Sequence, residues 1–208
     1  MRYTLLIRFG VAILLLFLLA PVQAGERTVL VLGDSLSAAY GMDREQGWVA
    51  LLDKRLRQDG LDWRAANAST SGDTTRGGLS RLPRALEQHE PAIVIIALGG
   101  NDGLRGVGPG EIVKNLQRMV DTARESNARV LIAGVRIPPN YGRAYTERFA
   151  NTFANVATEN DLPLVPRILD GVAEDSSLMQ DDGIHPRAEA QEQILDNIWS
   201  ELRPMLED

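Results

Sequence analysis

The stretch that decides the fold is VLVLGDSL, residues 29–36. Four apolar residues run directly into Gly33, Asp34 and Ser35. A short apolar run that ends at a glycine is typical of a buried strand. Such a strand usually lies in a parallel sheet that helices cover on both faces. Ser35 would then follow the carboxyl end of the strand, where open α/β sheets place their ligand crevices.

The rest of the chain alternates between strand and helix patterns. Apolar runs predict four more strands, and apolar residues at helical spacing predict five helices. The expected strands are 62–66, 92–98, 129–135 and 162–165, and the expected helices are 47–58, 74–89, 109–127, 143–159 and 188–205. This alternation predicts an α/β fold with a doubly wound parallel sheet of about five strands. No long linker divides the 208 residues, so one domain over 25–208 is expected.

The first 24 residues have the pattern of a secretory signal peptide. Arg2 and Arg8 precede an apolar stretch at 9–20, and the small residue Ala24 offers a cleavage site. An uncleaved membrane anchor is the alternative, but spanning a bilayer takes about 20 apolar residues. We therefore expect an exported, periplasmic protein that keeps no membrane anchor after cleavage.

Composition excludes several classes of function. The net charge is −6, and removal of Arg2 and Arg8 makes it −8, so a nucleic-acid partner is not expected. The absence of cysteine excludes disulfides, thiolate metal sites and cysteine nucleophiles. The chain contains no H-E-x-x-H or Walker motif. We expect no metal or cofactor, and a monomer whose partner is a small molecule.

Ser35 is a candidate nucleophile, and such a serine needs a nearby base. Histidine is the usual base for this role, and the chain contains only His89 and His185; His89 falls at the end of a predicted helix. Asp182 precedes His185 by three residues and is placed to orient the imidazole, with Asp181 as the alternative. Another interpretation is structural: Asp34 and Ser35 would cap the next helix, and 182–185 would be a helix-entry turn.

Ester hydrolysis also needs donors for the negative charge that develops on the carbonyl oxygen. The backbone N–H of Ser35, the backbone N–H of Gly72 and the side-chain amide of Asn101 are the candidates. Gly72 as an ordinary turn glycine and Asn101 as a turn or cap residue are the alternatives.

Taken together, these blocks resemble a known family. GDSL at 33–36, Gly72, GGND at 99–102 and DGIH at 182–185 match, in order, the blocks of the SGNH, or GDSL-type, hydrolases. The resemblance extends to the bacterial periplasmic thioesterase/lysophospholipase group of that family. It implies a three-layer, flavodoxin-like fold, and it also implies a mobile loop at 103–108 over an acyl-binding cleft.

The resemblance also assigns roles to single residues. Ser35 would be the nucleophile, His185 the base and Asp182 its orienting residue, while Ser35, Gly72 and Asn101 would form the oxyanion hole. The implied substrates are carboxylic esters, including aryl esters, and acyl thioesters, with lysophospholipids as further candidates.

Five apolar loop residues are candidates for binding the acyl chain. They follow strands at the expected ligand edge: Leu104, Val107, Ile137, Pro138 and Tyr141. Local loop packing is the alternative for all five. Two rival functions also remain: an acetyl-esterase that acts on cell-surface glycans, and a non-catalytic periplasmic binding module.

Overall fold

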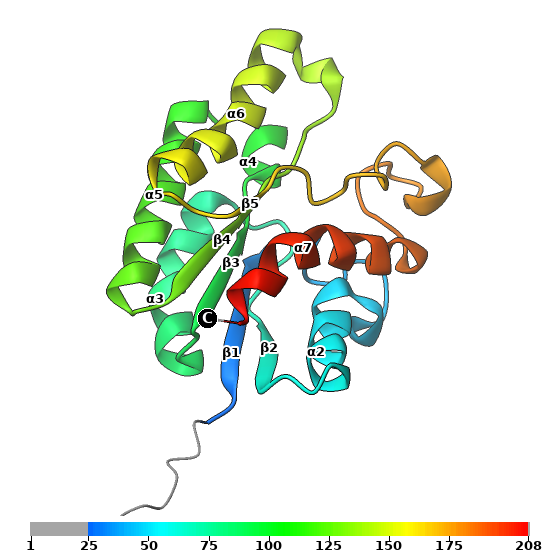
Figure 1. Cartoon of the computed structure of the whole chain (residues 1–208). Helices are drawn as coiled ribbons and strands as arrows, with labels where there is room; N and C mark the ends of the chain where they lie inside the picture. The colour runs from blue at the N-terminus through cyan, green and yellow to red at the C-terminus, as the bar shows by residue number, and fades with distance from the viewer. Residues whose placement is uncertain (1–24, 208) are drawn as a thin grey trace, which may run out of the picture.

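A five-stranded parallel sheet forms the centre of the computed structural model, which describes residues 25–207 (Figure 1). The strand order is β2-β1-β3-β4-β5. The strands are β1 (Arg27–Gly33), β2 (Trp63–Asn67), β3 (Ile93–Ala97), β4 (Arg129–Ala133) and β5 (Leu164–Val165). This is the flavodoxin-like order of a doubly wound sheet, so the predicted fold class is confirmed. The expected signal peptide at 1–24 lies outside the described residues.

Helices cover both faces of the sheet (Figure 1). One face packs against α2 (Trp48–Gln58) and α7 (Gln191–Met205). The other packs against α3 (Thr75–His89), α5 (Pro109–Glu125) and α6 (Arg143–Glu159). The fold therefore has the three layers that the resemblance implied.

The apolar run in β1 explains why both faces need a cover. Val29 and Val31 belong to the core under α2 and α7, whereas Leu30 and Leu32 belong to the opposite core. All four side chains are fully buried. Successive side chains of a strand point to opposite faces, so a continuous apolar run is buried only between two helical layers.

The structure differs from the expected elements in four places. Residues Gly100–Leu104 form a short helix, α4, where only a loop was expected. The last strand, β5, is two residues long, and residues 188–190 form a 3₁₀ turn before α7. Residues after Asp34 form turns, and the next helical segment begins at Arg44, so Asp34 and Ser35 do not cap a helix.

The strand order creates a switch point between β1 and β3. The chain leaves β1 toward one side of the sheet and leaves β3 toward the other, and such a point opens a crevice at the carboxyl ends of the strands. Ser35 follows β1 and Asn101 follows β3, so both residues lie at this crevice.

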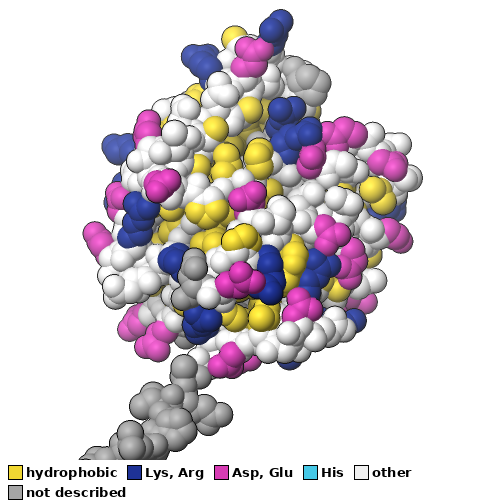
Figure 2. All heavy atoms as spheres, in the orientation of Figure 1, with side chains coloured by type: hydrophobic (Ala, Val, Ile, Leu, Met, Phe, Trp, Pro, Cys, Tyr) yellow, Lys and Arg dark blue, Asp and Glu magenta, His cyan; other side chains and the backbone are white. Residues whose placement is uncertain are grey.

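The described surface carries mixed charge. In the view of Figure 2, acidic and basic side chains alternate, with apolar side chains showing between them. No helix within residues 25–207 has the length and apolar character needed to cross a membrane.

Candidate active site

Ser35 and His185 meet at the crevice. The Nε2 atom of His185 lies 2.9 Å from the Oγ atom of Ser35, although 150 residues separate them in the chain. Ser35 is half-buried and stands in a tight turn, in which Ala38 donates its N–H to the Asp34 carbonyl at 3.0 Å. The imidazole is therefore within proton-transfer distance of the alcohol.

Asp182 holds the other side of the imidazole. Its Oδ2 atom lies 2.6 Å from His185 Nδ1, and its Oδ1 atom accepts the N–H groups of Ile184 and His185 at 2.9 and 3.0 Å. These backbone and side-chain hydrogen bonds lower the pKa of Asp182 from 3.8 to about 2. Asp182 is thus ionised at neutral pH, and it favours the tautomer with a proton on Nδ1.

The neighbouring carboxylate, Asp181, has a different partner. It forms an ion pair with Arg187 at 2.8 Å. Of the two candidate orienting residues, the structure places Asp182, and not Asp181, against His185. A helix-entry role for Asp182 is not observed, because the following 3₁₀ turn begins at Ala188 with Arg187 as its cap residue.

The segment that carries His185 is folded back on itself. Met179 and Pro186 form an antiparallel bridge, and Gln180 donates its N–H to the His185 carbonyl at 2.7 Å. Gly183 makes the reversal possible, because its φ of +66° is a conformation that other residues rarely adopt.

The three predicted oxyanion donors lie in three separate segments, which follow β1, β2 and β3. Within residues 25–207, no protein group accepts the backbone N–H of Ser35 or of Gly72, so both remain available to a substrate. Asn101 lies in α4 and lines the same cavity as Ser35. Gly72, with a φ of +78°, lies in the loop between β2 and α3 and does not line that cavity.

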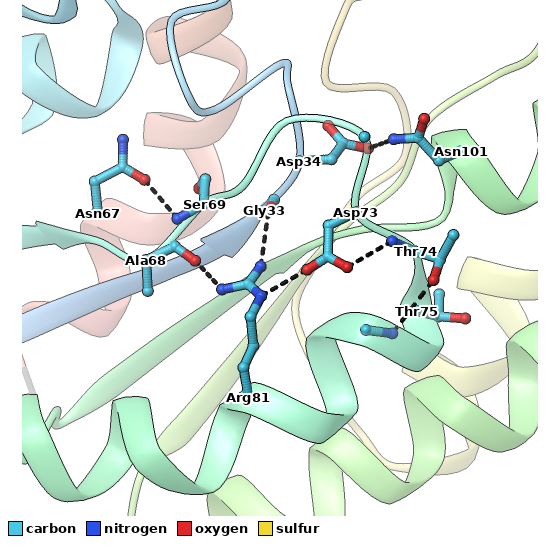
Figure 3. A network of polar contacts seen from close by, with 12 residues as sticks. Gly33, Asp34, Asn67, Ala68, Ser69, Asp73, Thr74, Thr75, Arg81 and Asn101 are labelled. Carbon is cyan, nitrogen blue, oxygen red and sulfur yellow. Dashed lines mark hydrogen bonds and ion pairs between the residues drawn. The ribbon is translucent and has the colours of Figure 1, made fainter.

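An aspartate next to each donor holds it in place. Asp34, next to Ser35, accepts the N–H of Leu36 at 3.0 Å and the side-chain amide of Asn101 at 3.3 Å. Asn101 has two amide hydrogens, so this bond orients the side chain and leaves one hydrogen free. Figure 3 shows the pair at the edge of a larger network.

Asp73, next to Gly72, is held by Arg81 of α3 (Figure 3). The Nε atom of Arg81 lies 2.5 Å from Asp73 Oδ2, and its other nitrogens donate to the carbonyls of Gly33 and Ala68. One guanidinium thus joins the end of β1, the end of β2 and the Gly72 loop.

Asp102, next to Asn101, is buried and attaches α4 to the start of α3. It accepts the backbone N–H of Thr75 at 2.8 Å and the Thr75 hydroxyl at 2.5 Å. Asn115 of α5 then donates to that hydroxyl at 3.1 Å. The positioning role of these three aspartates was not predicted from the sequence, although each stands directly after or before a predicted donor.

The cavity at Ser35 has a volume of about 450 Å³. Three of the five predicted acyl-chain residues line it: Leu104, Ile137 and Pro138. The structure places the other two elsewhere. Val107 packs against the core on the α3, α5 and α6 side, and Tyr141 directs its hydroxyl to the Leu104 carbonyl at 3.1 Å.

Further apolar residues line this cavity that the sequence analysis did not single out. They are Leu36, Val135, Leu169, Ala173, Met179 and Ile184. Three of them come from the segment between β5 and the DGIH block, which has no strand or helix periodicity that would place it. Arg136 and Glu174 are the charged residues of the lining besides Asp34 and His185.

Neither a metal cluster nor a second histidine belongs to the site. Residues 25–207 contain no group of three His, Asp or Glu side chains that could hold a metal ion. His89 ends α3, far along the chain from the crevice, and burial together with Arg64 lowers its pKa.

Comparison with known proteins identifies relatives. Residues 31–193 match the family described as GDSL-like Lipase/Acylhydrolase. Esterase TesA of Pseudomonas aeruginosa is 51% identical over 184 residues, covering 88% of this chain and 92% of that protein. Thioesterase 1/protease 1/lysophospholipase L1 of Escherichia coli (strain K12) is 40% identical over 206 residues, covering 99% and 98%. The solved structure of psychrotrophic esterase EstA from Pseudoalteromonas sp., inhibited by monoethylphosphonate, has a TM-score of 0.83 at 39% identity, covering 88% and 100%.

The buried carboxyl group of Asp34 predicts a pH dependence of stability. Burial raises its pKa from 3.8 to about 6, against the lowering effect of its hydrogen bonds. The folded protein therefore binds this proton more tightly than the unfolded chain does. The resulting stabilisation is complete below the unfolded pKa and is lost as the pH rises through about 6.

We expect Asp34→Asn to remove this contribution. The free energy of unfolding of the wild type, relative to that of the variant, should rise as the pH falls from about 8 to about 5. Denaturant unfolding at several pH values measures it. A difference between the two proteins that stays constant over this range would contradict the assignment.

Proposed function

The chain belongs to the GDSL-like lipase/acylhydrolase family, and on this premise we propose that it is a serine hydrolase of carboxylic esters and acyl thioesters. The observation that carries the proposal is the hydrogen-bonded series Asp182–His185–Ser35, with contacts of 2.6 and 2.9 Å. The names esterase and thioesterase/lysophospholipase of the relatives support this substrate class.

In the first half of the reaction, Ser35 Oγ attacks the carbonyl carbon of the substrate. His185 Nε2 takes the hydroxyl proton, and Asp182 stabilises the imidazolium that forms. The tetrahedral intermediate then collapses, the bond to the leaving oxygen or sulfur breaks, and His185 returns the proton to that atom. The acyl group remains on Ser35.

In the second half, water replaces the leaving group. His185 Nε2 takes a proton from the water as it attacks the acyl-enzyme, and the same proton returns to Ser35 Oγ when the carboxylic acid departs. In both halves, the negative charge on the carbonyl oxygen is stabilised by the N–H groups of Ser35 and Gly72 and the amide of Asn101.

The apolar cavity favours an acyl chain over an acetyl group. Its volume of about 450 Å³ is larger than a methyl group can fill. Most of the side chains that line it are apolar. This supports fatty acyl esters, thioesters and lysophospholipids over acetylated glycans. A binding module without catalysis is less well supported. Ser35 and Asp182 both lie within hydrogen-bond distance of the His185 imidazole, and neither caps a helix.

Two substitutions separate the role of the nucleophile from that of the oxyanion donor. Ser35→Ala should abolish hydrolysis of 4-nitrophenyl and thioester substrates without lowering thermal stability. Asn101→Ala should lower kcat by about 10²–10³, the usual loss for one oxyanion donor. Steady-state kinetics and thermal unfolding measure both effects. Turnover by Ser35→Ala, or an unchanged kcat in Asn101→Ala, would remove these roles.

A pair of nearby substitutions separates the cavity residues from their neighbours. Leu104→Ala should lower kcat/KM for long-chain esters by about tenfold relative to butyrate esters, because each lost contact with a methylene group costs up to about 0.8 kcal/mol. Val107→Ala, three residues further along the chain, is the matched control, and it should leave the chain-length profile unchanged. Equal effects of the two variants would contradict an acyl site in this cavity.

We further propose that residues 1–24 are a signal peptide and that the mature enzyme is a periplasmic monomer. Expression of the full chain in a Gram-negative host should give a periplasmic protein that begins at Gly25. Intact mass and N-terminal sequencing check this. A protein that retains Met1 and stays with the membrane fraction would contradict it.

A further inference from the structure

A second cavity adjoins the Asp182–His185 pair. It has a volume of about 450 Å³ and shares no lining residue with the acyl cavity. Tyr40, Gly41, Met42, Gln180, Asp181 and Asp182 contribute to its walls, and we call it the Tyr40 groove. Its lining is mainly polar, in contrast to the apolar residues around the acyl cavity.

Tyr40 connects this groove to the catalytic imidazole. Its ring lies 4.3 Å from the ring of His185, centre to centre, with 34° between the two planes. The side chain is 48% exposed, which is unusual for a large aromatic residue. One face of Tyr40 thus packs against His185, while much of the side chain remains open to a ligand.

The position of Tyr40 is fixed by the segment that carries His185. The side-chain amide of Gln180 donates to the carbonyls of Tyr40 and Pro186 at 2.9 and 3.0 Å. Gly41 makes this approach possible, since a Cβ atom there would lie 2.5 Å from Gln180 Oε1. The backbone of Tyr40 is therefore held against the segment that carries His185, and its ring packs on the imidazole.

The chemistry of the reaction suggests what this surface binds. His185 must hand a proton to the leaving atom, so the leaving group has to lie beside the imidazole. An ester has an apolar acyl end, which fits the acyl cavity, and a more polar alcohol end, which needs a different place. The Tyr40 groove is polar and separate from the acyl cavity, and Tyr40, one of its wall residues, packs against the ring of His185.

We propose that the Tyr40 groove is the leaving-group site and that it favours uncharged aromatic leaving groups over anionic ones. The inference rests on the proposed esterase function and specifies the alcohol end of its substrates. An aromatic ring stacks on the open part of Tyr40. The carboxylates Asp181 and Asp182 disfavour anions, and the one cation of the groove, Arg187, is already paired with Asp181.

The first test compares two esters of butyric acid, 4-nitrophenyl butyrate and ethyl butyrate. Tyr40→Ala should lower kcat/KM for the aryl ester about 2- to 10-fold more than for the ethyl ester, the range expected for one aromatic pair. Tyr40→Phe keeps the ring and should retain the wild-type ratio. The ratio between variant and wild type cancels the intrinsic reactivity of each ester.

The outcomes distinguish a binding site from mere support of His185. An equal loss on both esters would mean that Tyr40 acts only through the imidazole, and it would overturn the proposal. A Tyr40→Phe variant whose ratio of kcat/KM, aryl ester over ethyl ester, falls to that of Tyr40→Ala would overturn it as well. If the wild type hydrolyses neither ester, the proposed function itself fails.

The second test concerns charge and uses 3-carboxy-4-nitrophenyl butyrate beside the neutral 4-nitrophenyl ester. The wild type should have a higher kcat/KM for the neutral ester. Asp181→Asn should lower the ratio of the two kcat/KM values about 2- to 5-fold at low salt, because it removes a negative charge and frees Arg187 from its ion pair. High salt should weaken the effect. An identical preference in the variant at low salt would overturn the electrostatic part of the proposal.

Discussion

One hydrogen bond, between His185 Nε2 and Ser35 Oγ, joins the first strand to the last loop of the domain. Every other feature of the site depends on whether these two atoms meet. The parallel sheet brings Ser35 to the crevice, and the folded segment at 179–187 brings His185 to the same place. The bridge between Met179 and Pro186 and the Gln180 contacts with Tyr40 keep the two segments together.

The three proposed oxyanion donors are subject to a second constraint, which is that they must be rigid before substrate arrives. Loops rarely provide such rigidity by themselves. Here an aspartate stands beside each donor: Asp34 next to Ser35, Asp73 next to Gly72 and Asp102 next to Asn101. Each carboxylate is tied to another loop or helix, through Asn101, Arg81 and Thr75 respectively. The loops that carry the donors are thus cross-linked by polar contacts below the crevice.

This arrangement has an energetic cost at Asp34. Its carboxyl group is 3% exposed, and burial raises its pKa to about 6. Asp34 occupies this position although a buried carboxylate destabilises the fold above that pH. We attribute this to the geometry of the crevice, where Asp34 both shapes the Ser35 turn and orients the Asn101 amide.

The fold was largely predictable from the sequence. Glycines that end apolar runs mark strand ends, and parallel topology then collects those ends at one edge. The sequence favoured Asp182 over Asp181 as the partner of His185, but the contact itself needed coordinates, because residues three and four apart are both close in a turn. Coordinates were also needed to place the outer wall of the acyl cavity. The segment around Leu169 and Ala173 has no periodicity, and only contacts distant in sequence place it.

The aspartate scaffold could have been suspected but not deduced. Repetition of an acidic residue beside Ser35, Gly72 and Asn101 was visible in the chain. The role of these acidic residues was not visible, because the partner of Asp73 is Arg81. Arg81 comes from a helix face that looks solvated in the sequence. Likewise, Val107 and Tyr141 are hydrophobic, like the apolar residues that line the acyl cavity. Only the path of the chain in the structure shows that these two residues do not line it.

The central claim is that the imidazole of His185 activates the hydroxyl of Ser35. Treatment with an alkyl fluorophosphonate, followed by peptide mass mapping, tests it most directly. The account predicts a single covalent adduct on Ser35, formed at a rate that falls by orders of magnitude in His185→Ala. An adduct elsewhere, or labelling of Ser35 that is equally fast without the imidazole, would contradict it.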